Sequence, residues 1–345
     1  MSLPIIHEYK GMNNNEKRLL IAAEGFEDRA IHWIDGLNQD VLFCNAILCQ
    51  YVPVRKSKLK IIKAAIEKRT ENKPLIMKFN RFSPDGFERA FSEFCTKMIE
   101  YTDVYIDITV MSKFLIMILV FGLHSFEGRI HFIYSEPETW GPSKERFHRA
   151  LSSRKKGNAV CLSSKGVGEI VRTSSLSSII MQNEPSILIA GLSFNEMLVN
   201  LLINELNPEK LFLINQGCNR IPWREDAIEL IHREIIESYG GQDRVIYKYE
   251  LFEYDKVFDM LAEKYKQFWL THRMIVSPTG YKTHAIAFGL FKLCCPDIHV
   301  EYPTPDSYSF KGYSEGEVVK TYEICIDNMS NTIARLTDEY DLQSL

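Results

Sequence analysis

The sequence predicts an α/β protein made of two tandem Rossmann-like parallel-sheet units, followed by a C-terminal helix. Three observations predict this fold class. Buried apolar runs alternate with amphipathic segments along the chain, as in parallel strands joined by helices. Short motifs recur at a separation of about 168 residues. The length of 345 residues suits two domains of roughly 150 residues each.

The repeat is visible near both ends of each half. Leu20-Ile21-Ala22 and the Gly-Phe-Glu-Asp that follows correspond to Leu188-Ile189-Ala190 and the Ser-Phe-Asn-Glu that follows. Residues 130–138 correspond in the same way to 298–306. Agreement at both ends of so long a unit favours two copies of one α/β unit, which predicts an internal pseudo-dimer.

These observations set the expected domain boundaries. They are a first Rossmann-like unit at 1–138, a basic Ser-rich linker at 139–185, a second Rossmann-like unit at 186–316, and a C-terminal helix and tail at 317–345.

In the first half, residues 17–24 predict a buried parallel strand, because a continuous apolar run precedes a Gly and a helical pattern. Residues 87–101 predict an amphipathic helix, since apolar side chains recur every three or four positions. Residues 113–123 are apolar nearly all round, which predicts a helix buried between layers. The other expected elements are strands at 41–48, 75–79, 103–108 and 130–134 and a basic helix at 56–68.

The second half repeats this plan. Its expected strands are 186–190, 210–215, 244–249, 274–276 and 299–302, and its expected helices are 194–206, 226–238, 255–269 and 282–293. A helical segment at 317–336 ends the chain. This alternation predicts parallel sheets with right-handed crossovers in a Rossmann-like order.

Composition and charge exclude several classes of protein. A net charge of -4 and a pI near 6.2 give no general polyanion-binding signature. The eight cysteines form no CxxC pair, so we expect mostly buried thiols in a reducing compartment. The polar N-terminus shows no signal-peptide pattern, and the longest apolar run, 114–123, is too short to span a bilayer. We therefore expect a cytoplasmic protein without a membrane segment.

Familiar catalytic motifs are missing from the sequence. No HExxH, GxSxG, Walker A or complete GxGxxG motif occurs. The sequence therefore does not support a metalloprotease, an α/β-hydrolase, a P-loop protein or a standard dinucleotide-binding protein, and we expect neither a cofactor nor a metal site.

The linker carries a local positive charge. It is either a solvated linker with one helix or a basic arm that contacts a phosphate-bearing partner. The basic residues are Arg146, Arg149, Arg154, Lys155, Lys156 and Lys165.

The first pair of candidate ligand loops follows the first strand of each half, where ligands of open parallel sheets bind. In one copy the loop carries Glu27 and Asp28, and in the other Ser193 and Asn195. Free backbone N–H groups at a helix start can bind an anion. Glu27 and Asp28 would oppose a phosphate, so they are candidates for a helix cap, a ribose or base contact, or an acid–base role. Ser193 and Asn195 are equally ordinary N-cap residues.

The second pair of loops gives the sharper signal. Residues 107–113 and 277–283 each follow a strand and open a buried helix, with hydroxyl residues and a Lys at the helix start. A Lys there opposes the helix dipole but is useful for binding an anion. The candidate ligand-binding residues are Thr109, Ser112 and Lys113 in the first half and Thr279, Gly280, Lys282 and Thr283 in the second. A glycine at 280 would let the backbone approach a ligand closely.

These two loops resemble the strand–[Asp/Asn]-x-Thr-Gly-Gly-Thr-Lys–helix signature of CARF domains and the related SAVED sensors. The resemblance implies Rossmann-like modules that bind cyclic oligonucleotides in prokaryotic antiviral defence. It further implies that the Lys and hydroxyl residues of this loop face the ligand across a dimer axis. The matching residues here are Thr109, Ser112 and Lys113, and Thr279, Lys282 and Thr283.

A third set of candidates lies beyond the last strand of each half. Tyr302 and Tyr308 offer aromatic surface for stacking a base, and Asp306 lies where the first half has Glu138. A rigid proline-containing turn is the alternative interpretation. His284, two residues after Lys282, is a candidate acid–base group.

His131 and His299 also recur in the repeat. They lie inside expected strands, so we interpret them as structural histidines with satisfied hydrogen bonds.

Three functions remain open at this stage. The first is a sensor whose cleft between the duplicated halves binds a nucleotide or cyclic oligonucleotide, with an effector protein as partner. The second is an enzyme of phosphodiesterase, ring-nuclease or glycosidase type acting on such a ligand in the same cleft, with Glu27, Asp28 or His284 as acid or base. The third is a scaffold subunit of a defence complex. A homo-oligomer is compatible with each.

Overall fold

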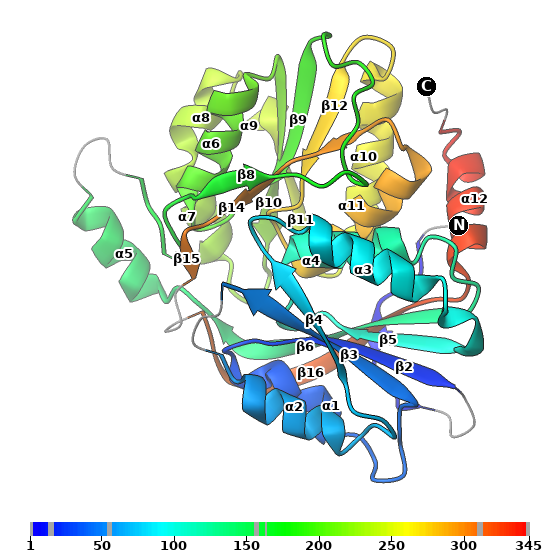
Figure 1. Ribbon diagram of the computed structural model, residues 1–345. Helices are drawn as coiled ribbons and strands as arrows, with labels where there is room; N and C mark the ends of the chain where they lie inside the picture. Colours follow the sequence, from blue (N-terminus) through cyan, green and yellow to red (C-terminus); the bar gives the residue numbers. More distant parts are fainter. Residues whose placement is uncertain are drawn as a thin grey trace. The chain divides into compact units, whose positions relative to one another are not determined.

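The computed structural model describes residues 3–12, 17–53, 57–154, 159–162, 164–308 and 313–342, except for the side chains of residues 99 and 315. The chain forms two compact units (Figure 1). The first unit comprises Met1–Trp140 and Ser314–Glu339, and the second comprises Gly141–Tyr313 and Tyr340–Leu345. Both units combine a sheet with covering helices, so the predicted α/β class is confirmed.

The first unit is built on a seven-stranded sheet with the order β1-β16-β6-β5-β2-β3-β4. Five strands are parallel and follow the Rossmann order, with the first strand in the middle. They are β2 (Arg18–Ala23), β3 (Asn45–Val52), β4 (Leu75–Asn80), β5 (Asp103–Asp107) and β6 (Arg129–Trp140). Two antiparallel strands, β16 (Ser314–Ile326) and β1 (His7–Glu8), extend the sheet beyond β6.

Helices cover both faces of this sheet (Figure 1). One face carries η1 (Asp28–Ile31), α1 (His32–Asp35) and α2 (Leu59–Glu67), and the other carries α3 (Asp85–Cys95), η2 (Met98–Glu100) and α4 (Lys113–Gly122). Trp33 of α1 packs with Phe43 and Tyr105 in the core of the first face. As its sequence predicts, α4 is buried from Phe114 through Val120.

The second unit has a five-stranded parallel sheet with the order β11-β10-β9-β12-β13. Its strands are β9 (Ser186–Gly191), β10 (Lys210–Gly217), β11 (Ile246–Glu250), β12 (Arg273–Ser277) and β13 (His299–Val300). Their order repeats that of the parallel strands in the first unit. The flanking helices are α6 (Glu196–Leu206), α7 (Trp223–Ile231), α8 (Arg233–Ser238), α9 (Gln242–Val245), α10 (Tyr254–Phe268) and α11 (Lys282–Cys294).

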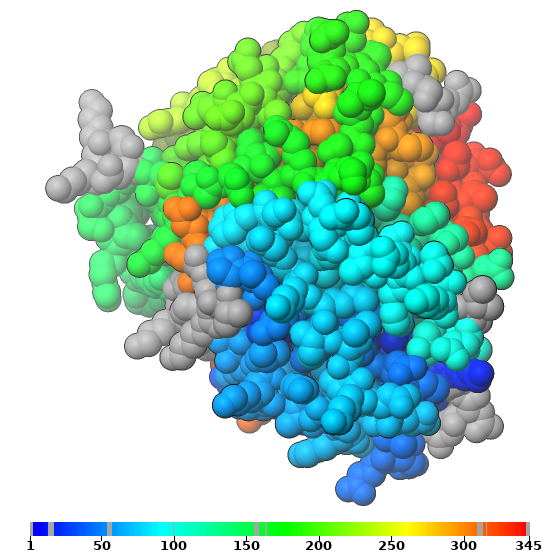
Figure 2. Space-filling view, viewed as in Figure 1, coloured from blue at the N-terminus to red at the C-terminus, as the bar shows by residue number. Residues whose placement is uncertain are grey.

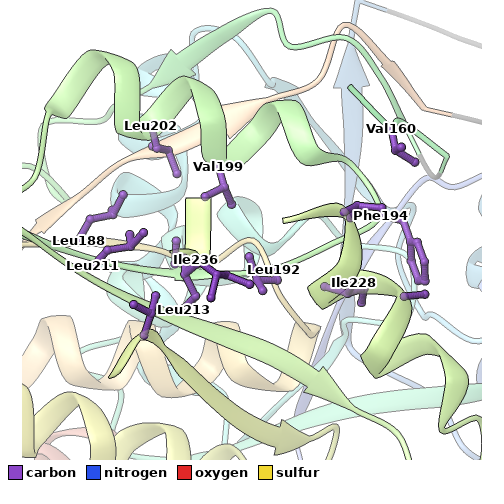
Figure 3. Close-up of a cluster of buried hydrophobic side chains, with 14 of the residues drawn as sticks. Val160, Leu188, Leu192, Phe194, Val199, Leu202, Leu211, Leu213, Ile228 and Ile236 are labelled. Carbon is purple, nitrogen blue, oxygen red and sulfur yellow. The ribbon is translucent and has the colours of Figure 1, made fainter. Parts of the chain in front are cut away.

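The core of the second unit lies between its sheet and the helices that follow β9 and β10 (Figure 3). Leucines from the two strands meet aliphatic side chains of three helices, because continuous apolar runs in parallel strands bury both sheet faces. The labelled contributors include Leu188, Leu211, Leu213, Val199, Leu202, Ile228 and Ile236.

The segment between the predicted units belongs to the second unit. It forms α5 (Lys144–Ser152) and two short strands, β7 (Ser164–Lys165) and β8 (Glu169–Val171). These strands pair with β15 (Ser307–Tyr308) and β14 (Tyr302–Thr304). Residues 155–158, with two of the predicted basic side chains, lie outside the described residues. The segment is therefore an ordered part of the fold on both sides of this gap.

The helix predicted for 317–336 is wrong over its first part. Residues up to Ile326 extend β16 along β6, and only then does α12 (Met329–Glu339) begin, with its atoms drawn red at the surface in Figure 2. The end of the strand alternates, with Ile324 and Ile326 buried on the same face, and it is rich in β-branched and aromatic residues. Pairing with this strand also explains why β6 runs past the predicted end at residue 134.

The repeated motifs occupy equivalent strands of the two sheets. Residues 20–22 lie on β2 and residues 188–190 on β9, each the central strand of its parallel set. His131 on β6 is paired with a residue of β5 as His299 on β13 is paired with a residue of β12. The topology therefore agrees with a duplication, which itself stays a prediction.

Candidate functional site

The predicted loops meet at the topological switch point of each sheet. In the first unit the chain leaves β2 toward β3, while β5 lies on the other side of β2. The loops after β2 and β5 therefore flank the crevice where open α/β sheets bind ligands. The loops after β9 and β12 do the same in the second unit.

A glycine brings the two loops into close contact in each unit. A Cβ added to Gly25 would lie 2.7 Å from the Cβ of Val110. A Cβ added to Gly191 would lie 2.2 Å from the backbone nitrogen of Gly280. The contact in the second unit therefore requires a glycine at residue 191, and the predicted approach of a ligand to Gly280 stays a prediction.

Glu27 is held in a buried ion pair. Its Oε2 accepts a hydrogen bond of 2.9 Å from Nε of Arg29 and another from the hydroxyl of Ser314. Arg29 also donates to the carbonyl oxygen of Ser135 at 2.6 Å and lies over the ring of Tyr134 at 5.4 Å. The carboxylate of Glu27 therefore stabilises its own loop, and its acid–base role stays a prediction.

Asp28 takes a different role from its neighbour. Its side chain is 92% exposed and pairs with Lys58 of the segment that precedes α2. As the first residue of η1, it lies where an acidic side chain favours a helix. Asp28 is therefore a solvated residue at a helix start, and its acid–base role stays a prediction.

The hydroxyl groups of the loop after β5 are used within the loop. The hydroxyl of buried Thr109 accepts a 3.0 Å hydrogen bond from the backbone N–H of Ser135. Ser112 is the N-cap of α4 and accepts a 3.2 Å hydrogen bond from the N–H of Leu115. Both residues hold the position of the α4 start.

Lys113, the first residue of α4, differs from these two. Within the described ranges its ammonium group makes no hydrogen bond and no ion pair within 4 Å. Desolvation lowers the pKa of Lys113 to about 8, while attraction from Glu27 opposes this drop. The positive end of the helix dipole also disfavours a cation here. An anion bound beside Lys113 would relieve both penalties.

In the second unit, the threonines of the corresponding loop are engaged by the backbone. The hydroxyl of Thr279 donates to the carbonyl of Gly191, and that of Thr283 donates to the carbonyl of Leu251. The hydroxyl of Tyr281 donates to the carbonyl of Gly217 at 3.0 Å. The loop therefore arches over the carboxyl ends of β9 and β10, with its threonine hydroxyl hydrogens donated to backbone carbonyls. Their role in ligand binding stays a prediction.

Ser193 and Asn195 shape the start of α6. Asn195 accepts a 3.2 Å hydrogen bond from the N–H of Met197 and donates to Ser164 at 2.6 Å. Ser193 accepts a 3.3 Å hydrogen bond from the N–H of Asn195. Asn195 is therefore the N-cap of α6, as the capping interpretation predicted, whereas Ser193 lies two residues earlier and holds the backbone of Asn195.

The start of α11 leaves polar groups unused. Its N-cap residue, Tyr281, makes no side-chain cap, and the first turn holds no acidic residue. Among the described residues, neither the Nδ1 atom of His284 nor the Oγ atom of Ser277 has a hydrogen-bond partner, although the side chains are only 1% and 0% exposed. A Cβ added to Gly280 would lie 3.8 Å from that Nδ1. Nδ1 of His284 thus lies in the first turn of α11, which begins with Lys282, and Ser277 is the last residue of the strand that leads to this helix.

The protonation state of His284 follows from its other contact. Its Nε2 lies 2.7 Å from the carbonyl oxygen of Glu250, so Nε2 carries the hydrogen and Nδ1 is a lone-pair acceptor. Burial lowers the pKa of His284 to about 4. A neutral imidazole at this position accepts a hydrogen bond from a ligand but does not protonate it near pH 7.

Arg224, which lies in the first turn of α7, beyond the carboxyl end of β10, was not singled out from the sequence. Its guanidinium group is buried, donates to the carbonyl of Gly141 at 2.9 Å and lies 4.7 Å from the ring centre of Phe194. Burial lowers its pKa, and the proximity of Tyr281 opposes that change. Its position after a strand and at the start of a helix is the sequence signal that could have identified it.

The third set of candidate residues, Tyr302, Asp306 and Tyr308, lies in and between the short strands β14 and β15 of the second unit. Tyr302 is buried in β14 and Tyr308 pairs with Ser164 through β15. The carboxylate of Asp306 lies against Gly166, whose φ of +61° only glycine adopts freely. Residues 309–312 of the Tyr- and Ser-rich run lie outside the described residues.

The two repeated histidines are structural, as predicted. His131 contacts Asp103 through Nε2 and Glu323 through Nδ1, at 2.9 and 2.6 Å. His299 contacts Glu301 at 2.8 Å and accepts from the N–H of Ser178 at 3.0 Å.

Neither a metal cluster nor a membrane helix is found in the part of the chain that the structure describes. No group of three or more His, Cys, Asp or Glu residues there could hold a metal ion. None of the helices there has the length and apolar character needed to cross a membrane.

The fold and the switch-point loops define this chain as a Rossmann-like α/β protein. No family model matches it, and no curated protein does so either. One solved structure, described as an NADH-dependent reductase A1-R' complexed with NAD, aligns over 84% of this chain and 96% of that chain, with 8% identity and a TM-score of 0.21. A similarity this weak gives no information about the function of this chain.

Proposed function

We propose that this protein binds a nucleotide-type ligand and that a phosphate group of the ligand lies at the start of α11. The observation that carries the proposal is a pair of buried atoms on the two elements that flank this loop, Oγ of Ser277 at the end of β12 and Nδ1 of His284 in the first turn of α11, which have no partner among the described residues. A buried polar group without a partner costs about 1–3 kcal/mol. A ligand that bonds to both atoms removes that cost, and the uncapped helix start supplies N–H donors for a phosphate.

The surrounding charges fit an anionic group joined to a hydroxyl-bearing one. Lys282 begins the helix, and Arg224 brings a buried positive charge close to Tyr281. Phosphate oxygens accept from such donors, whereas Nδ1 of His284 requires a donor such as a ribose hydroxyl. A nucleotide presents both groups next to each other.

The first unit offers a second contact of the same kind. Lys113 opens α4 at the equivalent switch point, with a pKa that desolvation lowers to about 8. A phosphate there would favour the charged amine and the helix start together. Each unit thus offers a phosphate contact of its own, and the cyclic oligonucleotide of a CARF- or SAVED-type antiviral sensor is the ligand that the loop resemblance suggests.

We favour binding over catalysis because the candidate acids and bases are already engaged. Glu27 is ion-paired with Arg29, Asp28 is paired with Lys58, and His284 is neutral with one nitrogen bonded to a carbonyl. An enzyme acting on a nucleotide is the second candidate. It is favoured by the amine of Lys113, whose lowered pKa leaves part of it uncharged at neutral pH.

The experiment is a thermal-unfolding screen of the full chain against cyclic di-, tri- and tetranucleotides, mononucleotides and NAD, followed by chromatography of each hit. A concentration-dependent rise in Tm with intact ligand supports a sensor, and ligand consumption supports the enzyme. Lys282→Ala and Lys113→Ala should each weaken binding by about tenfold or more. Lys63→Ala, on the exposed face of α2, is the matched control and should bind normally. Unchanged affinity in the double variant would overturn both candidates.

A further inference from the structure

Arg18, at the amino end of β2, is a buried cation without an anionic partner. Its side chain is 3% exposed, and within the described ranges its Nε and Nη2 atoms have no hydrogen-bond partner. A buried guanidinium in this state costs several kcal/mol unless something pairs with it. The two atoms form one edge of the guanidinium fork, which is the edge that binds a carboxylate in bidentate fashion.

Two carboxylates of the same sheet, those of Asp103 and Glu323, are bonded to other cationic groups. Asp103 faces Arg18 across the β2–β5 pair, but its oxygens bond to Arg129 at 2.7 and 3.2 Å and to His131 at 2.9 Å. Glu323 bonds to His131 at 2.6 Å and to His7 at 3.2 Å. Neither of these carboxylates therefore forms a hydrogen bond with Nε or Nη2 of Arg18.

Two further donors lie beside Arg18. In the described part of the chain, the indole N–H of Trp33 and the hydroxyl of Tyr9 are also buried without a partner, and their rings meet edge to face at 5.7 Å. Burial raises the pKa of Tyr9 to about 12. The approach of Trp33 and the charge of Arg18 oppose that rise. Arg18 shares a face of β2 with Leu20, which packs in the same cluster as Trp33 and Tyr9, so the three side chains lie on one face of the sheet. Tyr9 therefore stays protonated and is a donor near pH 7.

We propose that Arg18, Trp33 and Tyr9 form a binding site for a small carboxylate anion. The fork of Arg18 would hold both carboxylate oxygens, and the indole N–H and the phenol would each donate to one of them. A monovalent carboxylate fits better than a phosphate dianion, because Glu323 lies close enough to affect Tyr9 and would repel a second negative charge. This site uses the amino end of β2, whereas the switch-point loops lie at the carboxyl end, so it is independent of the nucleotide proposal.

The test is thermal unfolding of the full chain at pH 7 and constant ionic strength, with acetate, succinate, inorganic phosphate or chloride as the varied anion. Acetate or succinate at about ten times Kd should raise Tm by about 3 °C or more over chloride. Phosphate should give a smaller shift. No shift beyond chloride would mean that water alone solvates Arg18, and a response to phosphate only would exclude the carboxylate; either result overturns the proposal.

Variants separate a ligand site from a structural arginine. Arg18→Met should abolish the carboxylate response without lowering Tm in chloride, because an apolar side chain replaces an unpaired buried charge. Trp33→Phe keeps the ring, removes the donor and should raise the Kd by about tenfold. Arg335→Met, at a surface ion pair of α12, is the control and should respond normally. A normal carboxylate response in both Arg18→Met and Trp33→Phe would overturn the site, and if Arg18→Met fails to fold, the Trp33→Phe titration still decides.

Discussion

The imidazole of His131 on β6 lies 2.6 Å from the carboxylate of Glu323 on β16. Its other ring nitrogen lies 2.9 Å from Asp103 on β5. Because both nitrogens face a carboxylate, the ring is an imidazolium that links three adjacent strands of the first unit. This ion cluster joins the C-terminal strand to the parallel sheet.

We predict that this cluster makes the stability of the first unit pH-dependent. Burial opposes protonation of His131, but hydrogen bonds with Cys325, Glu323 and Asp103 raise its pKa to about 10. Since the unfolded pKa is about 6.5, the stabilisation is complete below that pH and is lost as pH rises through the folded pKa. The free energy of unfolding should fall between these values by up to about 1.4 kcal/mol per pH unit. Urea unfolding from pH 6 to pH 10 measures it, and an equal slope in His131→Gln would refute the assignment.

Lys113 should show the opposite behaviour. Its pKa near 8 in the folded protein lies below the unfolded value of about 10.4, so folding is penalised below pH 8 and the penalty disappears as pH rises to about 10.4. Lys113→Met should therefore unfold at a higher temperature than the parent at pH 7 and at the same temperature near pH 10.5. Lys63→Met should show no such convergence. A lower Tm for Lys113→Met at pH 7 would argue against a desolvated amine.

The contact between the loops of the second unit should tolerate no side chain at Gly191. Gly191→Ala would place a Cβ 2.2 Å from the backbone of Gly280, and we expect a loss of about 1–3 kcal/mol or more in the free energy of unfolding. Gly86→Ala in α3 is the control, because nothing lies within 4 Å of its added Cβ and a helical alanine is favoured by up to about 1 kcal/mol. Equal stability of the two variants in urea would contradict the described contact.

The end of β16 provides a test of the corrected C-terminal element. Ile324 is 2% exposed and Val319 is 48% exposed. Ile324→Ala should cost about 2–5 kcal/mol, while Val319→Ala should cost less than about 1 kcal/mol. Comparable losses from the two substitutions, measured by urea unfolding, would mean that 314–326 does not pack as this strand.

The sequence predicted the elements better than the uses of their side chains. Apolar runs and helical periodicity located most strands and helices, because burial in a parallel sheet leaves a strong pattern. The strand in 314–326 was missed because its stabilisation comes from pairing with β6, a contact distant in the sequence.

In the candidate site, too, contacts between residues distant in the sequence could not be predicted. Hydroxyl groups at a strand end were predicted to contact a ligand, and this stays a prediction. The sequence did not show that the hydroxyls of Thr279 and Thr283 donate to the carbonyls of Gly191 and Leu251. Because every residue has a backbone carbonyl, a sequence motif does not show which carbonyl accepts a side-chain hydrogen bond. Ser277 and Arg18 were not singled out for the converse reason, since only the folded arrangement shows that their polar atoms lack partners.

The most direct test of the proposed function is the affinity of Ser277→Ala for the nucleotide that gives the largest shift in the thermal screen. Because Oγ of Ser277 has no partner among the described residues, the variant should unfold at the same temperature as the parent or higher, while its Kd rises by about tenfold. Ser238→Ala, on the exposed surface of α8, should bind as the parent does. Unchanged affinity in Ser277→Ala, measured by calorimetric titration, would contradict a ligand at the start of α11.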